Sequence, residues 1–115
     1  MAKKDWSDVV KEKVKKYSKD QIIFTKSRLI DWLCRRNNST VEEMINEVIN
    51  SKDLVFSEKQ EAEYDREIEI RFRCYFVYSR NRGRCYILRF NHQIKVVTVF
   101  PLGRTTLKRY RRRFK

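Results

Sequence analysis

The spacing of apolar residues changes once along this chain. Up to about residue 50 they recur every three or four positions, whereas between residues 54 and 100 they alternate with polar residues. The first spacing is that of an amphipathic helix, and the second is that of a strand with one buried face. Helices that precede an antiparallel sheet indicate an α+β fold, and a length of 115 residues predicts a single domain, 1–115.

The helical part covers residues 5–50. We expect helices over residues 5–19, 25–36 and 39–50, with residues 21–24 as a short apolar link. Asp5 or Ser7 can cap the first helix, and Thr25 can cap the second. Ser39 and Glu42 have the spacing of a capping box, which predicts the start of the third helix.

The sheet part covers residues 54–100. We expect a short strand at 54–56, an acidic connection over 58–65, a long strand over 68–78 and two further strands over 85–90 and 94–100. Turn-forming residues at 81–83 and 91–93 arrange these strands as a three- or four-stranded antiparallel meander. Residues 104–115 form a basic tail, which is either an extended arm or a short helix that packs through Leu107, Tyr110 and Phe114.

Charge is distributed unevenly along the chain. Residues 70–115 hold 14 of the 28 Lys and Arg residues and none of the 15 Asp and Glu residues. One part of the molecule is therefore expected to present a strong positive field. A polyphosphate chain is the commonest partner of such a field, because binding releases its condensed counterions. The charge pattern favours nucleic acid over an anionic membrane surface or an acidic protein.

The long strand predicts which basic residues face outward. If Ile68, Phe72 and the residues in phase with them pack on the helices, Arg71 and Arg73 lie on the opposite face with Tyr75. Guanidinium groups and an aromatic ring on an open sheet face can stack on bases, which favours RNA over DNA. An ordinary solvated face is the alternative interpretation. The expected nucleic-acid contacts are Arg71, Arg73, Tyr75, Arg80, Arg82, Lys108, Arg109, Arg111, Arg112 and Arg113.

The cysteine and histidine content argues against a metal site. The chain has three cysteines, none of them in a C-x-x-C pair, and His92 is its one histidine. Neither a zinc site nor a disulfide framework is expected, and no motif indicates a cofactor. No signal peptide is recognisable, and no apolar run approaches the ~18 residues that span a bilayer. We therefore expect a cytoplasmic protein with no membrane partner.

Two regions of the chain carry a family resemblance. The first runs from Phe24 to Leu29, through Arg35-Arg36, and from Ser39 to Ile45; the second comprises 82–88, 94–101, Arg104 and Tyr110. Together they resemble the barnase–EndoU–colicin–RelE superfamily. The second region is similar to RelE/ParE-like toxins, in which an arginine-bearing strand is followed by another strand, an arginine and a late tyrosine.

This resemblance implies metal-independent cleavage of RNA. In such ribonucleases the 2′-hydroxyl attacks the adjacent phosphate, and the protein supplies an acid, a base and cations for the developing charge. By this resemblance Arg84 or Arg89, with Arg104, would hold the phosphate. Tyr110 would transfer a proton or stack on a base, and Lys95 would assist. An acidic antitoxin would be a further partner.

Three functional hypotheses follow. The first is a RelE-like endoribonuclease toxin or its inactivated relative, although this chain has Lys26-Ser27 where related domains often carry His. The second is a non-catalytic DNA- or RNA-binding regulator or chromatin-type protein, of viral or archaeal type. The third is an interaction module for an acidic protein. Convergence of Arg84 or Arg89, Arg104 and Tyr110 on one concave spot favours the first, and scattered positions favour plain binding.

Overall fold

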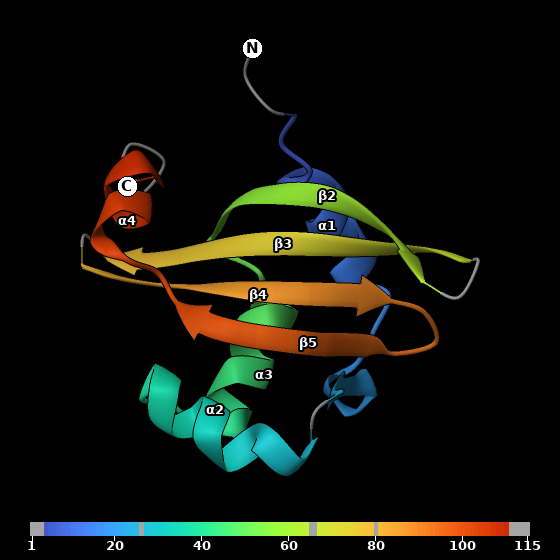
Figure 1. The fold of residues 1–115 in the computed structure, drawn as a ribbon, viewed down its shortest axis with the longest axis horizontal. Helices are drawn as coiled ribbons and strands as arrows, with labels where there is room; N and C mark the ends of the chain where they lie inside the picture. Colours follow the sequence, from blue (N-terminus) through green and yellow to red (C-terminus); the bar gives the residue numbers. More distant parts are fainter. Residues whose placement is uncertain (1–3, 26, 65–66, 80, 111–115) are drawn as a thin grey trace.

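A computed structural model describes residues 4–25, 27–64, 67–79 and 81–110 and confirms the α+β class (Figure 1). Its helices are α1 (Ser7–Val14), α2 (Ile30–Asn37), α3 (Val41–Asn50) and α4 (Arg104–Tyr110), with single 3₁₀ turns at Lys19–Gln21 and Ser27–Leu29. Its strands are β1 (Ile22–Phe24), β2 (Leu54–Tyr64), β3 (Glu67–Ser79), β4 (Arg82–Phe90) and β5 (Ile94–Pro101).

The sheet contains one strand more than the alternation in the sequence predicts. In the described residues the strand order is β1-β5-β4-β3-β2, and β2 to β5 form the expected antiparallel meander. The segment predicted as an apolar link is β1, which runs parallel to β5 with Ile22 opposite Ile94. Three residues are too few to display a period of two, so only the tertiary pairing identifies this strand.

The predicted acidic connection is also part of a strand. Residues 54–64 form β2, which pairs with β3 along its whole length and places Glu58 opposite Arg73 and Glu61 opposite Ile70. This end of the hairpin extends beyond the helices, since Ile68 and Ile70 are 70% and 44% exposed. Both faces of β2 therefore contact solvent here, and the sequence lacks the alternation of apolar and polar residues that would have identified a strand.

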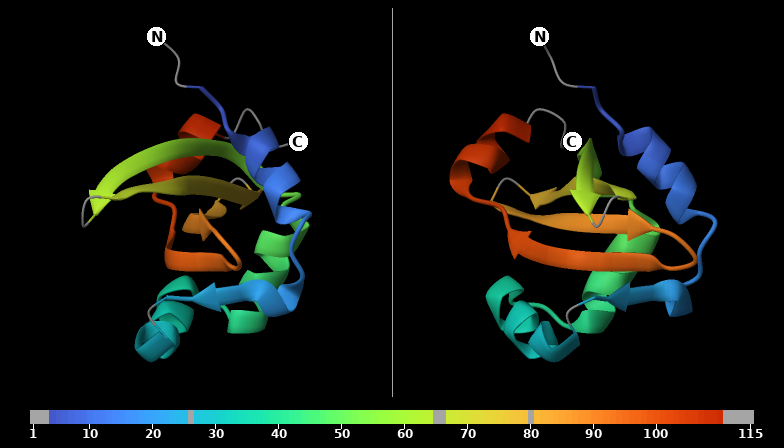
Figure 2. Two further views of the ribbon diagram at one scale, coloured as in Figure 1. Left: turned by 90° about the vertical axis from the view of Figure 1, so that its right-hand side faces the viewer. Right: turned by 45° about the vertical axis from the view of Figure 1, so that its right-hand side comes forward.

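The helices cover the two faces of the sheet unequally. In Figure 2, α1 and α3 lie on one side of the sheet. Their apolar side chains form the main core with alternate residues of β3, β4 and β5. The fully buried side chains of this core include Val10, Val14, Met44, Val48, Phe76, Tyr86, Leu88 and Val99. The period-two pattern of the long strand was thus correctly interpreted for Phe72, Cys74 and Phe76, whereas Ile68 and Ile70, which were expected on the same buried face, are exposed.

Helix α4 packs on the opposite face, at one end of the sheet. Leu107 and Tyr110 are 5% and 6% exposed and pack with Phe56, Val77 and Cys85. The short-helix alternative for the basic tail is therefore confirmed up to Tyr110. Phe114, the third predicted anchor, lies outside the described residues.

Two capping predictions differ from the structure. Thr25 was expected to cap the second helix, but α2 begins at Ile30 with Leu29 as its N-cap. The predicted cap of the third helix is shifted by one residue. The N-cap of α3 is Thr40, whose hydroxyl oxygen accepts a hydrogen bond of 3.1 Å from the backbone N–H of Glu43. Ser39 and Glu42 were the predicted pair. The sequence Ser39-Thr40-Val41-Glu42-Glu43 offers the same spacing twice, and local spacing alone cannot choose between the two.

Candidate nucleic-acid interface

The open face of the sheet carries both signs of charge. Arg71 and Arg73 lie opposite the main core, as predicted, but they are not alone there. One oxygen of Glu69 is 2.5 Å from Nε of Arg71, and its other oxygen is 2.6 Å from Nε of Arg89. Glu58 lies beside Arg73 in the register of β2 and β3. The acids of the first 69 residues thus neutralise much of this face, and a uniform positive surface does not form here.

Tyr75 is not available to stack on a base. Its side chain is only 9% exposed. Its ring stacks on the ring of Tyr110 with a centroid distance of 5.0 Å and lies 6.1 Å from the ring of Phe56. This tyrosine anchors α4 to the sheet, and its ring does not lie on an open face as the prediction of a nucleic-acid contact assumed.

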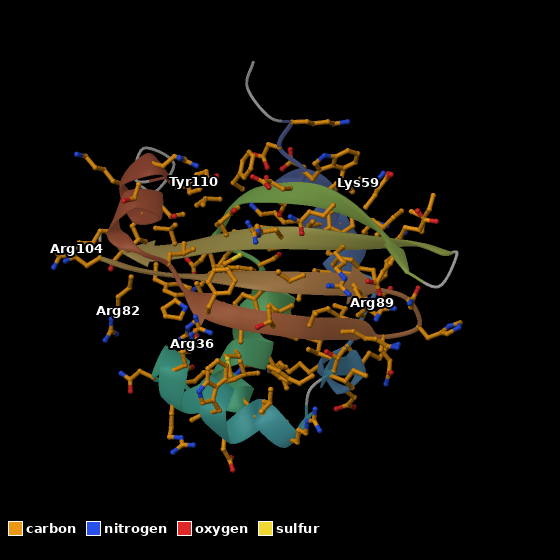
Figure 3. The ribbon with its side chains drawn as sticks, viewed as in Figure 1. Arg36, Lys59, Arg82, Arg89, Arg104 and Tyr110 are labelled. Carbon is orange, nitrogen blue, oxygen red and sulfur yellow. The ribbon has the colours of Figure 1, made fainter. Side chains whose placement is uncertain are left out.

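The five side chains expected to form a catalytic site are dispersed. Arg84 and Arg89 lie towards opposite ends of β4 and on opposite faces, and Lys95 is the register partner of Arg89. In Figure 3, Arg104 and Arg89 lie at opposite ends of the sheet. Tyr110 is buried in the cluster under α4. These residues do not converge on one concave spot.

A different set of basic residues does converge. Arg36, Arg82 and Arg84 line an open pocket of about 230 Å³ where the end of α2 meets the β3–β4 turn and the end of β5. Amide side chains accompany the arginines, and no Asp or Glu is among the described residues that line the pocket. The remaining lining residues are Asn37, Asn38, Tyr78, Asn81, Gly83, Pro101 and Leu102. We call this site the arginine pocket.

Arg84 is held in the wall of the arginine pocket by three neighbours. Its Nη1 donates to Glu47 Oε2 at 3.3 Å, and its Nη2 donates to the backbone oxygen of Asn37 at 3.3 Å. The guanidinium also lies 5.4 Å from the ring centroid of Tyr78. A guanidinium has five N–H donors in a fixed plane, so this arrangement can orient the group and still leave it able to bind an anion.

Glu47 is the acidic partner of Arg84 and lies behind it, outside the pocket lining. Its side chain is 11% exposed, and it accepts hydrogen bonds from Arg84 and from the hydroxyl of Tyr78. Burial raises the pKa of Glu47 to about 7, and the nearby positive charge of Arg84 only partly opposes this rise. Tyr86 faces the same cluster, and its pKa is raised by burial and then by the charge of Glu47. The carboxyl group therefore titrates near neutral pH.

The charges of Arg36 and Arg82 are not neutralised by any acidic residue in the described part of the chain. Both side chains are exposed, and neither has an acidic partner within 4 Å among the described residues. The Arg36 guanidinium lies 5.1 Å from the ring centroid of Trp32 and 5.9 Å from that of Phe100. Cation–π contacts with these two rings therefore position Arg36 in place of an ion pair.

Asn37 fixes the end of α2 against the sheet. Its buried side-chain nitrogen donates to the backbone oxygens of Leu33 at 2.9 Å and Val99 at 3.3 Å. Asn38 follows in a left-handed conformation with φ of 49°, which ends the helix. These two residues, which the sequence indicates only as a helix breaker, set the position of Arg36 at the pocket.

The other predicted contacts lie in the arginine pocket, on α4 or outside the described residues. Arg82 is in the pocket, whereas Arg104, Lys108 and Arg109 are exposed on α4. In Figure 3, Arg36, Arg82 and Arg104 lie towards the same end of the sheet. The predicted contacts that lie outside the described residues are Arg80, Arg111, Arg112 and Arg113.

Comparison of the chain with protein-family models, with curated proteins and with solved structures finds no significant match. The function is therefore inferred from the site and not from relatives. Within the described residues, no group of three or more His, Cys, Asp or Glu side chains is arranged to hold a metal ion. The same part of the chain contains no helix with the length and apolar character needed to cross a bilayer.

Proposed function

We propose that this protein binds nucleic acid without cleaving it. The observation that carries the proposal is the arginine pocket. Three arginines line it, no Asp or Glu is among its described lining residues, and two of the three arginines have no acidic partner in the described part of the chain. A backbone phosphate is the ligand that matches this planar, multidentate set of donors.

The electrostatics of the whole chain support the same ligand. The net charge is +13, and the exposed cations of α4 lie towards the same end of the sheet as the pocket. Such a field attracts a polyanion over a distance of several ångströms, and the pocket then fixes one phosphate. Phosphate contacts position a nucleic acid without reading its sequence, so we expect little sequence preference from this pocket alone.

Variants of the two unpaired arginines test the proposal. Arg36→Ala and Arg82→Ala should each weaken the binding of labelled RNA about tenfold, the loss expected for one charge-assisted hydrogen-bonding group. Each should also lower the slope of log K against log salt by about 0.7 on a single strand. Lys15→Ala removes the same charge at the C-cap of α1, where the ammonium is exposed and pairs with Glu12 at 3.1 Å, and serves as the matched control. Equal affinities of all three variants would refute the pocket as the binding site.

A second candidate function is metal-independent cleavage of RNA, as the RelE-like resemblance implies. The observation in its favour is Glu47, a carboxyl group with a pKa of about 7 that contacts two residues of the pocket wall. A group with such a pKa can accept and return a proton near neutral pH. Labelled RNA should then be cut in the presence of EDTA, alone or on translating ribosomes, and Arg84→Ala should abolish the products. If neither naked RNA nor RNA on translating ribosomes is cut, cleavage is refuted and the proposal of binding alone stands.

A further inference from the structure

Trp32 is unusually placed for a tryptophan in a small domain. It is 46% exposed on α2, while Leu33 and Asn37 of the same helix face the sheet and are buried. A single exposed apolar residue needs no explanation by itself. Here, however, the indole lies next to the arginine pocket through Arg36, which contacts its ring and lines the pocket. The indole and the pocket thus form one continuous surface.

Arg36 connects the aromatic surface to the phosphate site. Its guanidinium is within 6 Å of the centroids of two rings, those of Trp32 and Phe100. Trp32 and Arg36 are four residues apart on one helix, so their side chains project from the same side of α2. Contact with two rings restricts the motion of the guanidinium, which lowers the entropy lost when it binds a phosphate.

We propose that an unpaired base stacks on the exposed indole of Trp32 while the neighbouring phosphate occupies the arginine pocket. This inference rests on the proposed function and specifies its ligand as single-stranded nucleic acid. The faces of bases inside a duplex are covered by their neighbours, whereas bases of single strands offer free π-faces to aromatic side chains. A duplex could still reach the pocket with a phosphate, but it would leave Trp32 unused.

Alanine substitution of Trp32 separates the two classes of ligand. Trp32→Ala should weaken the binding of a labelled oligouridine of about twelve nucleotides by about 5- to 150-fold, which is the usual range for the loss of one base–aromatic stack. Binding of a blunt RNA duplex of the same length should change less than about twofold, because phosphate contacts dominate duplex affinity. Trp32→Phe should keep most of the affinity for the single strand, since a ring remains.

Fluorescence tests the stack in a protein that keeps the indole of Trp32. Trp6 is the other tryptophan, and it packs edge-on against Phe72 at 6.3 Å. In the Trp6→Phe protein the emission comes from Trp32 alone. Oligouridine should quench this emission saturably, and the duplex should leave it nearly unchanged.

The outcomes distinguish this inference from the function on which it rests. Absence of quenching by oligouridine, or unchanged single-strand affinity of folded Trp32→Ala, would overturn the stack. If Arg36→Ala and Arg82→Ala still weaken binding in that case, the arginine pocket remains the binding site. Equal loss of single-strand and duplex affinity in Trp32→Ala would also count against the stack. If the wild-type protein binds neither RNA, the proposed function itself fails.

Discussion

Replacing Glu47 by Gln should remove most of the dependence of stability on pH between about 4.5 and 7. The folded protein raises the pKa of this carboxyl from 4.5 to about 7 by burial, so it holds a proton over a range in which the unfolded chain has released it. The free energy of unfolding of the wild type should therefore fall as the pH rises through this window. A shift of this size corresponds to about 3 kcal/mol at ~1.4 kcal/mol per pKa unit. Glutamine has no proton to lose; its amide oxygen can accept from Arg84 in place of Oε2, and its amide nitrogen can donate to the Tyr78 hydroxyl in place of Oε1.

Urea unfolding at a series of pH values measures this effect. The difference in unfolding free energy between Glu47→Gln and wild type should change by about 3 kcal/mol between pH 4.5 and pH 7.5, in favour of the variant at high pH. Glu12→Gln is the matched control, because Glu12 is 72% exposed and pairs only with Lys15 among the described residues. The unfolding free energy of Glu12→Gln should change with pH in parallel with that of the wild type. If Glu47→Gln is also parallel, the carboxyl is not protonated in the folded state near neutral pH, and the reasoning from burial is wrong.

Two further predictions concern packing. Gly83→Ala should lower the free energy of unfolding by about 1–3 kcal/mol, because an added Cβ would lie 2.6 Å from the backbone oxygen of Phe76, which cannot move without the strand. Gly103→Ala, where nothing lies within 4 Å of that Cβ, should differ by less than about 0.5 kcal/mol in urea unfolding. Truncation after Gly103 should lower thermal stability, because it removes two buried side chains of α4 worth about 1.5–3 kcal/mol each; an unchanged melting temperature would contradict the packing of this helix.

The class of fold could be predicted from the sequence because burial imposes a period. The third helix was expected to end at residue 50, and α3 ends there, since its apolar stripe faces the sheet. β1 and most of β2 were missed for opposite reasons. Residues 22–24 are too few to show a period, and residues 58–64 have lost it because both of their faces contact water. Pairing with strands far away in the sequence decides the conformation of both segments.

The site was predictable in part. Arg82 and Arg84 were selected from the sequence, whereas Arg36 was noted only as a helix end and as part of the family resemblance, with no binding role. Its place in the pocket depends on the docking of α2 against β5. Glu47 left only a weak signal: it precedes Val48 directly and follows Met44 by three residues, so it borders the apolar stripe of α3. The absence of acids after Glu69 suggested a uniform positive face, but strand pairing returns acids from earlier in the chain to the same surface.

The parallel pairing of β1 with β5 has a consequence for the order of folding. It joins residues 22–24 to residues 94–96, and the backbone N–H of Thr25 adds a bond of 3.1 Å to the oxygen of Val96. Nearby, the hydroxyl of Tyr17 donates to the backbone oxygen of Asn91 at 2.6 Å. Closing such a long loop costs more entropy than forming the local turns of the meander. On a ribosome, the segment around β1 must therefore wait until residues 94–96 of β5 have been synthesised, so we expect β1 to dock after the antiparallel meander has formed.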